Sequence, residues 1–485
     1  METSAAARFA GNQRLIVLLA KEIKSPYLLG ALRRVNSLFR ASVTHILFSR
    51  IHINGTRAHR VNSLVDSPLL QHVETLSVGS CQSRLDALNH NLRAVLLPRL
   101  PQVTAFWWLT RGLEKKTLHA LCELCPKLTS LRVVTDPDEW YKLKGHWFYT
   151  EDDLAVQMPR FAGLDDLALY RLQGSFLEAS ELATLLRNNA PTLRSLLLST
   201  LDAVTQDCLA CRMARRSGHV KFVLSLDDVA LLYQLPANDD PPREPLPRLA
   251  LRHLTIGPGV TLPSHWAAGK LLDRLVLEEL RLANCKQKLS TEYPYGYDLA
   301  VFDDTACPRL RAYSVGVMDT EVCGFLARRE PAWTRQLAVV SAMQRGWSPL
   351  VQQLSDRFVR RQWRMLVVDL TRVCTDDDDD DEDGDVRRHV ISLLAPLVRA
   401  DEGSTAMQGM QLVVRKTQWR LLRLESVLAA LASLAGLQQM VLDFTWVPMD
   451  GRYIPRFDPE GVALLLAQRI TRLQYIRISS SSWRV

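Results

Sequence analysis

The chain alternates between two spacings of apolar residues. Short segments of the form L-x-x-L-x-L place leucine-like residues two apart, which is the spacing of one face of a β-strand. Between these segments, apolar residues recur every three or four positions, which is typical of helices. The helical stretches are clearest at 113–124, 178–188, 421–434 and 459–470. We therefore predict short strands that alternate with helices.

The strand-like segments also recur at a steady interval. Taking the penultimate apolar residue of each segment as a marker gives fourteen positions, separated on average by about 31 residues, which lies within the range of solenoid repeats. The markers are Leu76, Thr104, Leu131, Leu167, Leu196, Phe222, Leu254, Leu280, Tyr313, Leu337, Leu366, Met410, Met440 and Ile476, of which Thr104, Phe222, Leu337, Leu366 and Met410 come from weaker segments.

This periodicity predicts an α/β fold, namely a leucine-rich-repeat solenoid with a curved parallel sheet and outer helices. A strand of this length cannot survive alone, and stacked units would share one continuous core. We assign residues 56–485 to the array and expect a proline-rich loop insertion at 235–247 and an acidic insertion at 375–386. The alternative is a large, non-repetitive parallel α/β domain whose strands happen to be rich in leucine.

Residues 1–55 differ from the rest and predict a small helical module. Residues 28–40 read LLGALRRVNSLFR and residues 46–53 read ILFSRIHI. These two stretches resemble the F-box of fungal F-box/leucine-rich-repeat proteins. The first helix departs from that pattern, because Asn12-Gln13-Arg14-Leu15 stands where the family has Leu-Pro-x-Glu. The departure bears on the affinity for an adaptor more than on the fold.

The resemblance implies a function as well as a fold. F-box proteins of this type dock on the adaptor Skp1 of a cullin-based ubiquitin ligase, while their repeats select the substrate. The positions that would be shared between the module's core and a Skp1-like adaptor are Leu28, Leu29, Leu32, Val35, Leu38, Phe39, Leu47 and Phe48. A simpler alternative is that these residues only cap the open end of the solenoid, because terminal repeats need a cover.

The composition is that of a globular protein in a reducing compartment. Of 485 residues, 47% are apolar and 23% are charged, which excludes disordered and fibrous classes. No apolar run is long enough to span a membrane. Nine cysteines, an odd number without dense spacing, do not make a disulfide framework. We expect a cytoplasmic or nuclear protein that does not enter membranes.

The charge is unevenly distributed. Residues 376–385 read DDDDDDEDGD, and without those nine carboxylates the net charge would rise from +8 to +17. A basic body of this kind can attract an acidic partner, nucleic acid or anionic lipid, and charge alone does not choose among them. The acidic run lacks the glutamate that a calcium loop needs, since Val390 occupies that position.

No motif points to catalysis. The sequence contains no nucleophile elbow, phosphate loop or zinc-protease motif. The Cys122/Cys125 and Cys208/Cys211 pairs lie too far apart in the sequence to complete one zinc site. Two clusters of tryptophan and arginine occur in the sequence, but they do not belong to a recognised nucleic-acid-binding module. We expect no enzyme activity, cofactor, metal or nucleic-acid partner, although an enzyme on a non-repetitive α/β fold stays open as a third reading.

The expected binding surface follows from the strand pattern. Residues between the paired leucines point away from the core, which places Arg132, Thr255, Arg281 and Arg477 on the concave strand surface. A shift in register by one residue would move each of them into the core. Three arginines favour an acidic or phosphorylated protein substrate. Tyr295 and Tyr297, within an expected exposed loop, are further partner-binding candidates.

These observations together predict a substrate-recognition subunit of a Skp1-cullin-F-box ubiquitin ligase, whose repeat surface binds target proteins. The alternative is a leucine-rich-repeat scaffold for protein–protein interaction that has no connection to ubiquitin.

Overall fold

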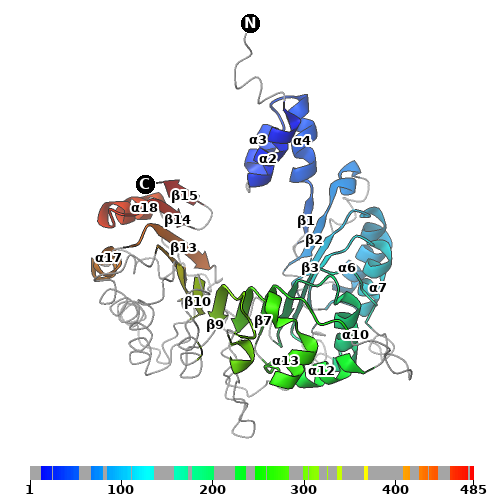
Figure 1. Ribbon diagram of the computed structural model, residues 1–485. Helices are drawn as coiled ribbons and strands as arrows, with labels where there is room; N and C mark the ends of the chain where they lie inside the picture. Colours follow the sequence, from blue (N-terminus) through cyan, green and yellow to red (C-terminus); the bar gives the residue numbers. More distant parts are fainter. Residues whose placement is uncertain are drawn as a thin grey trace, which may run out of the picture. The chain divides into compact units, whose positions relative to one another are not determined.

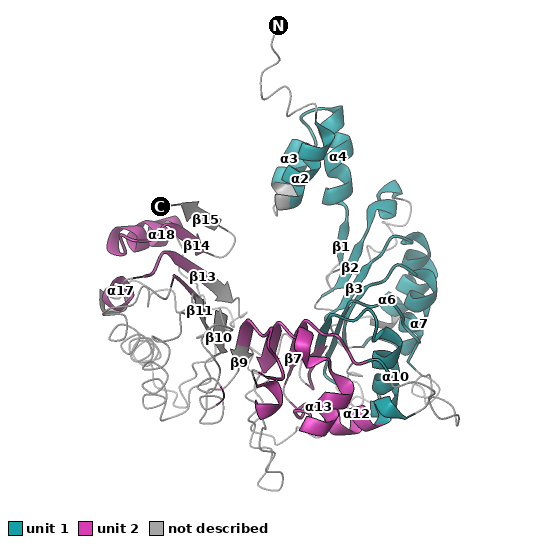
Figure 2. Cartoon of the chain, viewed as in Figure 1, with its two compact units in different colours: residues 1–196, 232–247 teal, residues 197–231, 248–485 magenta. Residues whose placement is uncertain are grey.

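The computed structural model (Figure 1) forms two compact units, Met1–Leu196 with Leu232–Pro247, and Leu197–Leu231 with Arg248–Val485 (Figure 2). The structure describes residues 12–23, 26–53, 67–79, 85–110, 112–135, 158–172, 177–200, 224–235, 246–257, 259–282, 299–303, 305–315, 325, 336–340, 365–369, 408–415, 425–434, 436–445, 459–478 and 481–484.

The first unit begins with three short helices. They are α2 (Gln13–Glu22), α3 (Pro26–Leu32) and α4 (Ser37–Leu47). Asparagine side chains cap the N-terminal ends of two of these helices. Asn12 accepts hydrogen bonds from the backbone N–H groups of Arg14 and Leu15, and Asn36 accepts one from Phe39 at 2.9 Å. These bonds satisfy backbone donors that a helix start leaves unpaired. The helices enclose a small core of Ile16, Ala20, Leu29, Phe39 and Val43.

A parallel sheet follows in the same unit. Its strands are β1 (Arg50–Ile53), β2 (Thr75–Val78), β3 (Ala105–Trp108), β4 (Ser130–Val134) and β5 (Asp166–Tyr170), and each pairs with the next in sequence. Figure 1 shows α7 (Lys115–Leu124) and α10 (Ala179–Asn189) on the same face of this sheet. Shorter helical turns connect the remaining strands: η2 (Pro68–His72), α6 (Leu85–Asn91), η3 (Leu92–Leu96) and η4 (Leu97–Arg99).

The second unit repeats this plan. From β7 (His253–Ile256) to β14 (Tyr475–Ile478) neighbouring strands pair in parallel and in sequence order, and β15 (Ser481–Arg484) closes the series antiparallel to β14. The intervening strands are β8 (Glu279–Leu282), β9 (Ala312–Val315), β10 (Gln336–Val340), β11 (Met365–Asp369), β12 (Gly409–Arg415) and β13 (Gln439–Thr445).

Helices lie between the strands of this unit where the chain is described. They are α13 (His265–Leu271), η6 (Arg274–Val276), η7 (Leu299–Phe302), α17 (Glu425–Ala432) and α18 (Pro459–Arg469). Two further elements, β6 (Ser195–Leu198) and α12 (Leu226–Gln234), cross the boundaries between the two units.

The predicted markers align in register. In the first unit Ile51, Leu76, Phe106, Leu131 and Leu167 are paired in turn across β1 to β5. In the second unit one row runs through Leu254, Leu280, Tyr313, Leu337, Leu366, Met410, Met440 and Ile476. The marker at Thr104 was wrong, because Phe106 is the residue in that row, and Phe222 lies outside the described residues.

One backbone arrangement repeats at the entry to successive strands. A single carbonyl accepts the N–H groups of the residue before the next strand and of the first residue of that strand, as Glu74 does from Thr104 at 2.8 Å and Ala105 at 3.0 Å. The other carbonyls that do so, among the described residues, are those of Ser49, Thr129, Thr104, Asp165, Arg252, Glu278, Gln408 and Gln438. The recurrence at one position of the L-x-x-L-x-L segment shows that the repeats are structurally equivalent.

The fold is therefore α/β, with parallel sheets and covering helices, as predicted. Sequential strand order within each unit contradicts a doubly wound sheet, whose order must reverse. The four predicted helical stretches correspond to α7, α10, α17 and α18. The end of the predicted helical module differs, because residues 50–53 form strand β1 and pair with β2. None of the described helices is long and apolar enough to cross a membrane.

Candidate functional site

The N-terminal helices present an apolar surface in addition to their core. We call it the helical apolar surface, and it consists of side chains that are 39–61% exposed: Leu15, Leu18, Leu19, Leu28 and Val35. Exposed apolar patches can mark sites where a protein binds another molecule. The surface is therefore a candidate protein-binding site.

Only part of this surface was predicted. Leu28 and Val35 are exposed, whereas Leu29 and Phe39 are buried in the module's own core. The side chains of Leu32, Leu38 and Leu47 pack against that core and are partly buried. Phe48 is half-buried, with the Arg33 guanidinium 5.3 Å from its ring centroid. Most of the eight predicted positions thus hold the module together, and their role in binding an adaptor stays a prediction.

Sequence reasoning missed the contribution of the first helix. In α2, Ile16 and Ala20 point into the core, while Leu15, Leu18 and Leu19 lie on the exposed side. Leu18 and Leu19 follow Leu15 by three and four residues, which is a second helical stripe. A helix with two apolar stripes has more apolar surface than one core can cover. That excess was visible in the sequence QRLIVLLAKE.

The same module is strongly basic. Residues 13–47 contain six lysines or arginines and one glutamate. Of the cationic side chains, Arg34 and Arg40 are exposed, and Arg33 donates a hydrogen bond from Nε to Thr44 Oγ1 at 3.0 Å. A partner that covers the helical apolar surface would therefore gain from an acidic rim.

On the sheet of the first unit, Arg132 lies in an aromatic and acidic setting. Its Nε donates to Asp166 Oδ2 at 2.7 Å, and its guanidinium lies 5.2 Å from the centroid of a Trp107 ring. The Ser130 hydroxyl donates to the same carboxylate oxygen at 2.7 Å. Leu131 and Val133 on either side are fully buried, so Arg132 points away from the core, as its position between two leucines implies.

The other predicted strand residues occupy the equivalent position in the second unit. Thr255 is paired with Arg281 across β7 and β8, and Arg477 with Val441 across β13 and β14. Each lies between two buried apolar residues. Arg281 is exposed, while Thr255 and Arg477 are half-buried. Their placement follows the predicted register, and their role in partner binding stays a prediction.

The side chains that hold Arg281 were not foreseen. Arg281 Nε contacts Glu279 Oε1, and Glu279 Oε2 lies 3.0 Å from His253 Nδ1. Burial by itself raises the pKa of the Glu279 carboxyl, but the Arg281 and His253 side chains lower it more, so this pKa lies below its ordinary value. Glu279 thus contacts two neighbours, Arg281 on its own strand and His253 on the adjacent strand.

Several predicted features lie outside the described residues. They are Tyr295 and Tyr297, most of the insertion at 235–247, the acidic insertion at 375–386, and the Cys208/Cys211 pair. Of the other pair, Cys125 is buried and Cys122 half-buried, and burial raises the pKa of the Cys125 thiol to about 11. No three side chains of the described residues are arranged to hold a metal ion.

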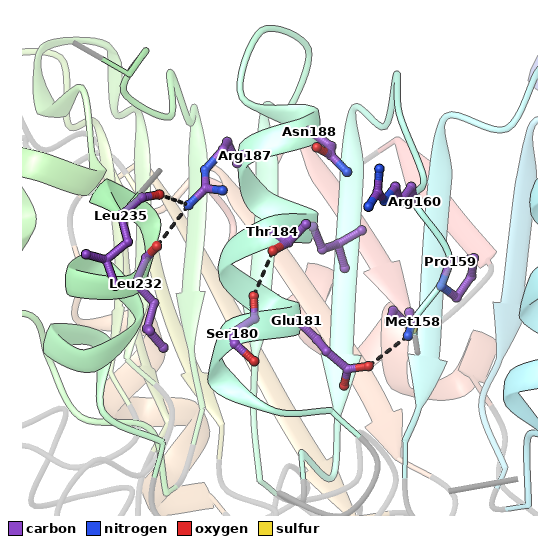
Figure 3. Close-up of a pocket in the computed structure, with 11 residues that line it drawn as sticks. Met158, Pro159, Arg160, Ser180, Glu181, Thr184, Arg187, Asn188, Leu232 and Leu235 are labelled. Atoms are coloured by element: carbon purple, nitrogen blue, oxygen red, sulfur yellow. Dashed lines mark hydrogen bonds between the residues drawn. The ribbon is translucent and has the colours of Figure 1, made fainter. Parts of the chain in front are cut away.

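A pocket of about 350 Å³ lies over α10 in the first unit (Figure 3). On one side Arg187 Nη2 donates to the backbone oxygens of Leu232 and Leu235, at 2.9 and 2.8 Å. On the other side Glu181 accepts a hydrogen bond from the backbone N–H of Met158 at 2.8 Å. Arg187 thus caps the last carbonyls of α12, and the polar side chains at both ends of the pocket have structural partners.

Comparison with known proteins assigns no family. No protein-family model matches the chain, and no curated protein matches it.

Proposed function

We propose that this protein is the substrate-recognition subunit of a Skp1-cullin-F-box ubiquitin ligase, of the fungal F-box/leucine-rich-repeat type. In this proposal the N-terminal helices dock on a Skp1-like adaptor. The strand face of an irregular leucine-rich-repeat solenoid binds the target protein. The chain would work in the cytoplasm or the nucleus, without catalysis or a cofactor of its own.

The observation that carries the proposal is the helical apolar surface. Its five side chains belong to two neighbouring helices and to the turn after them, and the module has already used other residues for its core. Burying a large apolar side chain is worth about 1.5–3 kcal/mol. A partner with an apolar groove and an acidic rim would match both this surface and the basic residues around it.

The repeat array supports the second half of the proposal. Paired leucine-like residues point into the core, and the doubled hydrogen bond to one carbonyl recurs from repeat to repeat. The side chains between the leucines, such as Arg132 and Arg281, are carried on a rigid sheet and lie at least partly in solvent. Rigid, regularly spaced side chains suit recognition of another protein.

The mechanism would be proximity. A receptor that holds a target near a ubiquitin-loaded enzyme raises the effective concentration of the two reactants, and it needs no reactive group. The absence of a catalytic motif in the sequence agrees with such a role.

A second candidate is a leucine-rich-repeat scaffold with no connection to ubiquitin. The start of α2 favours it, because Asn12 caps this helix where the F-box family has a different opening. In this reading the helices would cover the first repeat. They do contact it, since His45 Nε2 lies 3.3 Å from Glu74 Oε1, and the His45 ring stacks on that of His72.

Capture by an adaptor separates the two candidates. Purified Skp1-like adaptor is immobilised and incubated with the full-length chain at micromolar concentration. We expect capture by the natural chain and a loss of at least about tenfold for Leu18→Glu and Val35→Glu, since each places a charge in an apolar contact. Leu464→Glu is the matched control, because Leu464 is 60% exposed on α18 in the second unit.

The variants must stay folded for this comparison to count. Leu18 and Val35 are exposed. The thermal unfolding of Leu18→Glu and of Val35→Glu should therefore match that of the natural chain. If the natural chain is not captured, the ligase proposal is wrong and the scaffold remains. Equal capture of all three variants would mean that the adaptor binds elsewhere, which also contradicts the proposal.

A further inference from the structure

Three arginines of the second unit contact two consecutive carboxylates, Glu278 and Glu279, at the start of β8. We call Arg252, Arg281 and Arg311 the arginine cluster. Glu278 accepts contacts from two of them, with Arg252 Nε at 4.0 Å from Oε1 and Arg311 Nη2 at 2.5 Å from Oε2. Glu279 Oε1 contacts Arg281 Nε. Two members of the cluster, Arg252 and Arg311, were not singled out from the sequence.

The backbone fixes the spacing of the cluster. Arg252, Glu278 and Arg311 occupy the same place in three successive repeats, directly before the strands β7, β8 and β9. The N–H of Glu278 donates to the carbonyl of Arg252, and the N–H of Arg311 to that of Glu278, both at 2.9 Å. Adjacent strands are about 4.8 Å apart, so these side chains form a row of fixed pitch.

The arginines lie outside and the carboxylates beneath them. The arginine side chains are 59–65% exposed, whereas those of Glu278 and Glu279 are 20% and 23% exposed. Each arginine contacts its carboxylate through one nitrogen in the described part of the chain. Arginine has five N–H donors in a rigid fork. The carboxylates therefore orient the guanidinium groups, and each exposed guanidinium has further N–H donors besides the one in contact with its carboxylate.

We propose that the arginine cluster binds an acidic segment of a partner protein, whose carboxylates accept hydrogen bonds from these further guanidinium donors. The inference rests on the proposed function only in that it takes the strand face as the surface that recognises the target. Exposed ion pairs contribute little free energy by themselves. An incoming carboxylate that disrupts them therefore loses little stabilisation. Orientation by Glu278 and Glu279 lowers the entropy that each arginine loses on binding.

The net charge of the cluster is small. Three arginines against two glutamates leave a net charge of +1. Nucleic acid needs a broad basic stripe along its phosphates, and a cluster of this net charge does not supply one.

The test is direct binding of a fluorescein-labelled oligo-aspartate peptide, measured by fluorescence polarisation. Because residues 376–385 carry nine carboxylates that can compete for the same arginines, binding is measured on the full-length chain and on a full-length variant with that run changed to asparagine and glutamine. An oligo-asparagine peptide is the neutral control probe. We expect saturable binding of oligo-aspartate to at least one of the two proteins.

Substitutions assign the binding to the cluster. We expect Arg281→Gln and Arg311→Gln each to weaken the affinity about tenfold, as loss of a charge-assisted hydrogen bond does. Arg472→Gln is the matched control, since Arg472 is an exposed arginine of the same unit beyond α18. A loss of less than about twofold in both cluster variants, or an equal loss in Arg472→Gln, would overturn the inference.

Two other outcomes are also decisive. Absence of oligo-aspartate binding by both proteins would overturn the inference, and binding of a phosphoserine peptide alone would reassign the cluster to phosphorylated targets. The adaptor experiment is independent of this peptide experiment, because it measures binding to the N-terminal helices of the first unit. A chain that binds oligo-aspartate but no adaptor would refute the ligase proposal and keep this inference.

Discussion

Gly257 follows strand β7 at a point of close backbone approach. Its N–H donates to the carbonyl of Leu198 at 2.7 Å. A methyl group at this position would lie 3.0 Å from that carbonyl oxygen and would collide with the Ser199 side chain. We expect Gly257→Ala to lower the free energy of unfolding by about 1–3 kcal/mol, because backbone atoms cannot move aside cheaply.

Gly269 is the matched control for that prediction. It lies within helix α13, and nothing is within 4 Å of the position that a Cβ would occupy. Gly269→Ala should raise the free energy of unfolding by about 0.5–1 kcal/mol, since alanine loses less backbone entropy in a helix. Denaturant unfolding followed by circular dichroism measures both changes, and equal effects of the two substitutions would show that packing at Gly257 was misjudged.

At the residue scale, the sequence predicts which way a side chain points better than it predicts which residues that side chain contacts. The L-x-L pattern is enough to place Arg132 and Arg281 outside the core, because side chains alternate along a strand. The contact of Glu279 with Arg281 joins residues two apart on one strand, so the same pattern could have predicted it. The pattern cannot show that Asp166 contacts Arg132, since that contact depends on which strand is adjacent and in what register. The Thr104 marker shifted by two residues for a related reason: in PQVTAFWW several residues fit an alternating pattern.

At the scale of single elements, a buried asparagine joins α10 to the segment before β5. Asn189 Nδ2 donates to the carbonyls of Phe161 and Leu185, at 2.9 and 2.8 Å, and Oδ1 accepts from the N–H of Leu164 at 2.8 Å. We expect Asn189→Ala to lower the free energy of unfolding by about 2–4 kcal/mol, because it leaves buried backbone groups without partners.

The neighbouring asparagine tests this explanation. Asn188 is half-buried at the edge of the pocket over α10, so Asn188→Ala should change the free energy of unfolding by less than about 0.5 kcal/mol. Both values come from equilibrium unfolding in urea. Similar losses in the two variants would mean that helix propensity, and not the buried hydrogen bonds, determines the result.

Helices and strands could be predicted where the spacing of apolar residues is regular. The four helical stretches were located because their apolar residues follow a 3.6-residue period. The strand β1 was not, since ILFSRIHI continues an apolar pattern from α4 and nothing in the local sequence marks the change at Ser49. The helical apolar surface was found only in part, because a sequence shows that a helix is apolar and not which side its neighbours cover.

At the scale of the whole molecule, the described strands within each unit pair in sequence order, each with the one before and the one after it. We therefore expect the effect of Asn189→Ala to be local. Amide hydrogen exchange should accelerate in peptides that contain β5 and α10 and stay unchanged in peptides that contain β12 to β14, because chains with nearest-neighbour contacts can open in part. Mass spectrometry of the exchanged protein measures this, and equal acceleration in both regions would contradict it.

The architecture was the most predictable level of all. Fourteen short segments add up to a strong periodic signal, even when single members such as Tyr313 or Met410 replace leucine. The arginine cluster could not be predicted in the same way. Arg252 and Arg311 precede their strands, and only the doubled hydrogen bond to one carbonyl brings them beside Glu278.

That doubled bond has a consequence for redesign. The same main-chain hydrogen bonds recur between repeats whatever side chains stand between the paired leucines. A protein engineer could therefore rewrite those outward positions as a set, exchanging arginine for glutamate or aromatic residues across several repeats, and retarget the molecule while its framework stays intact.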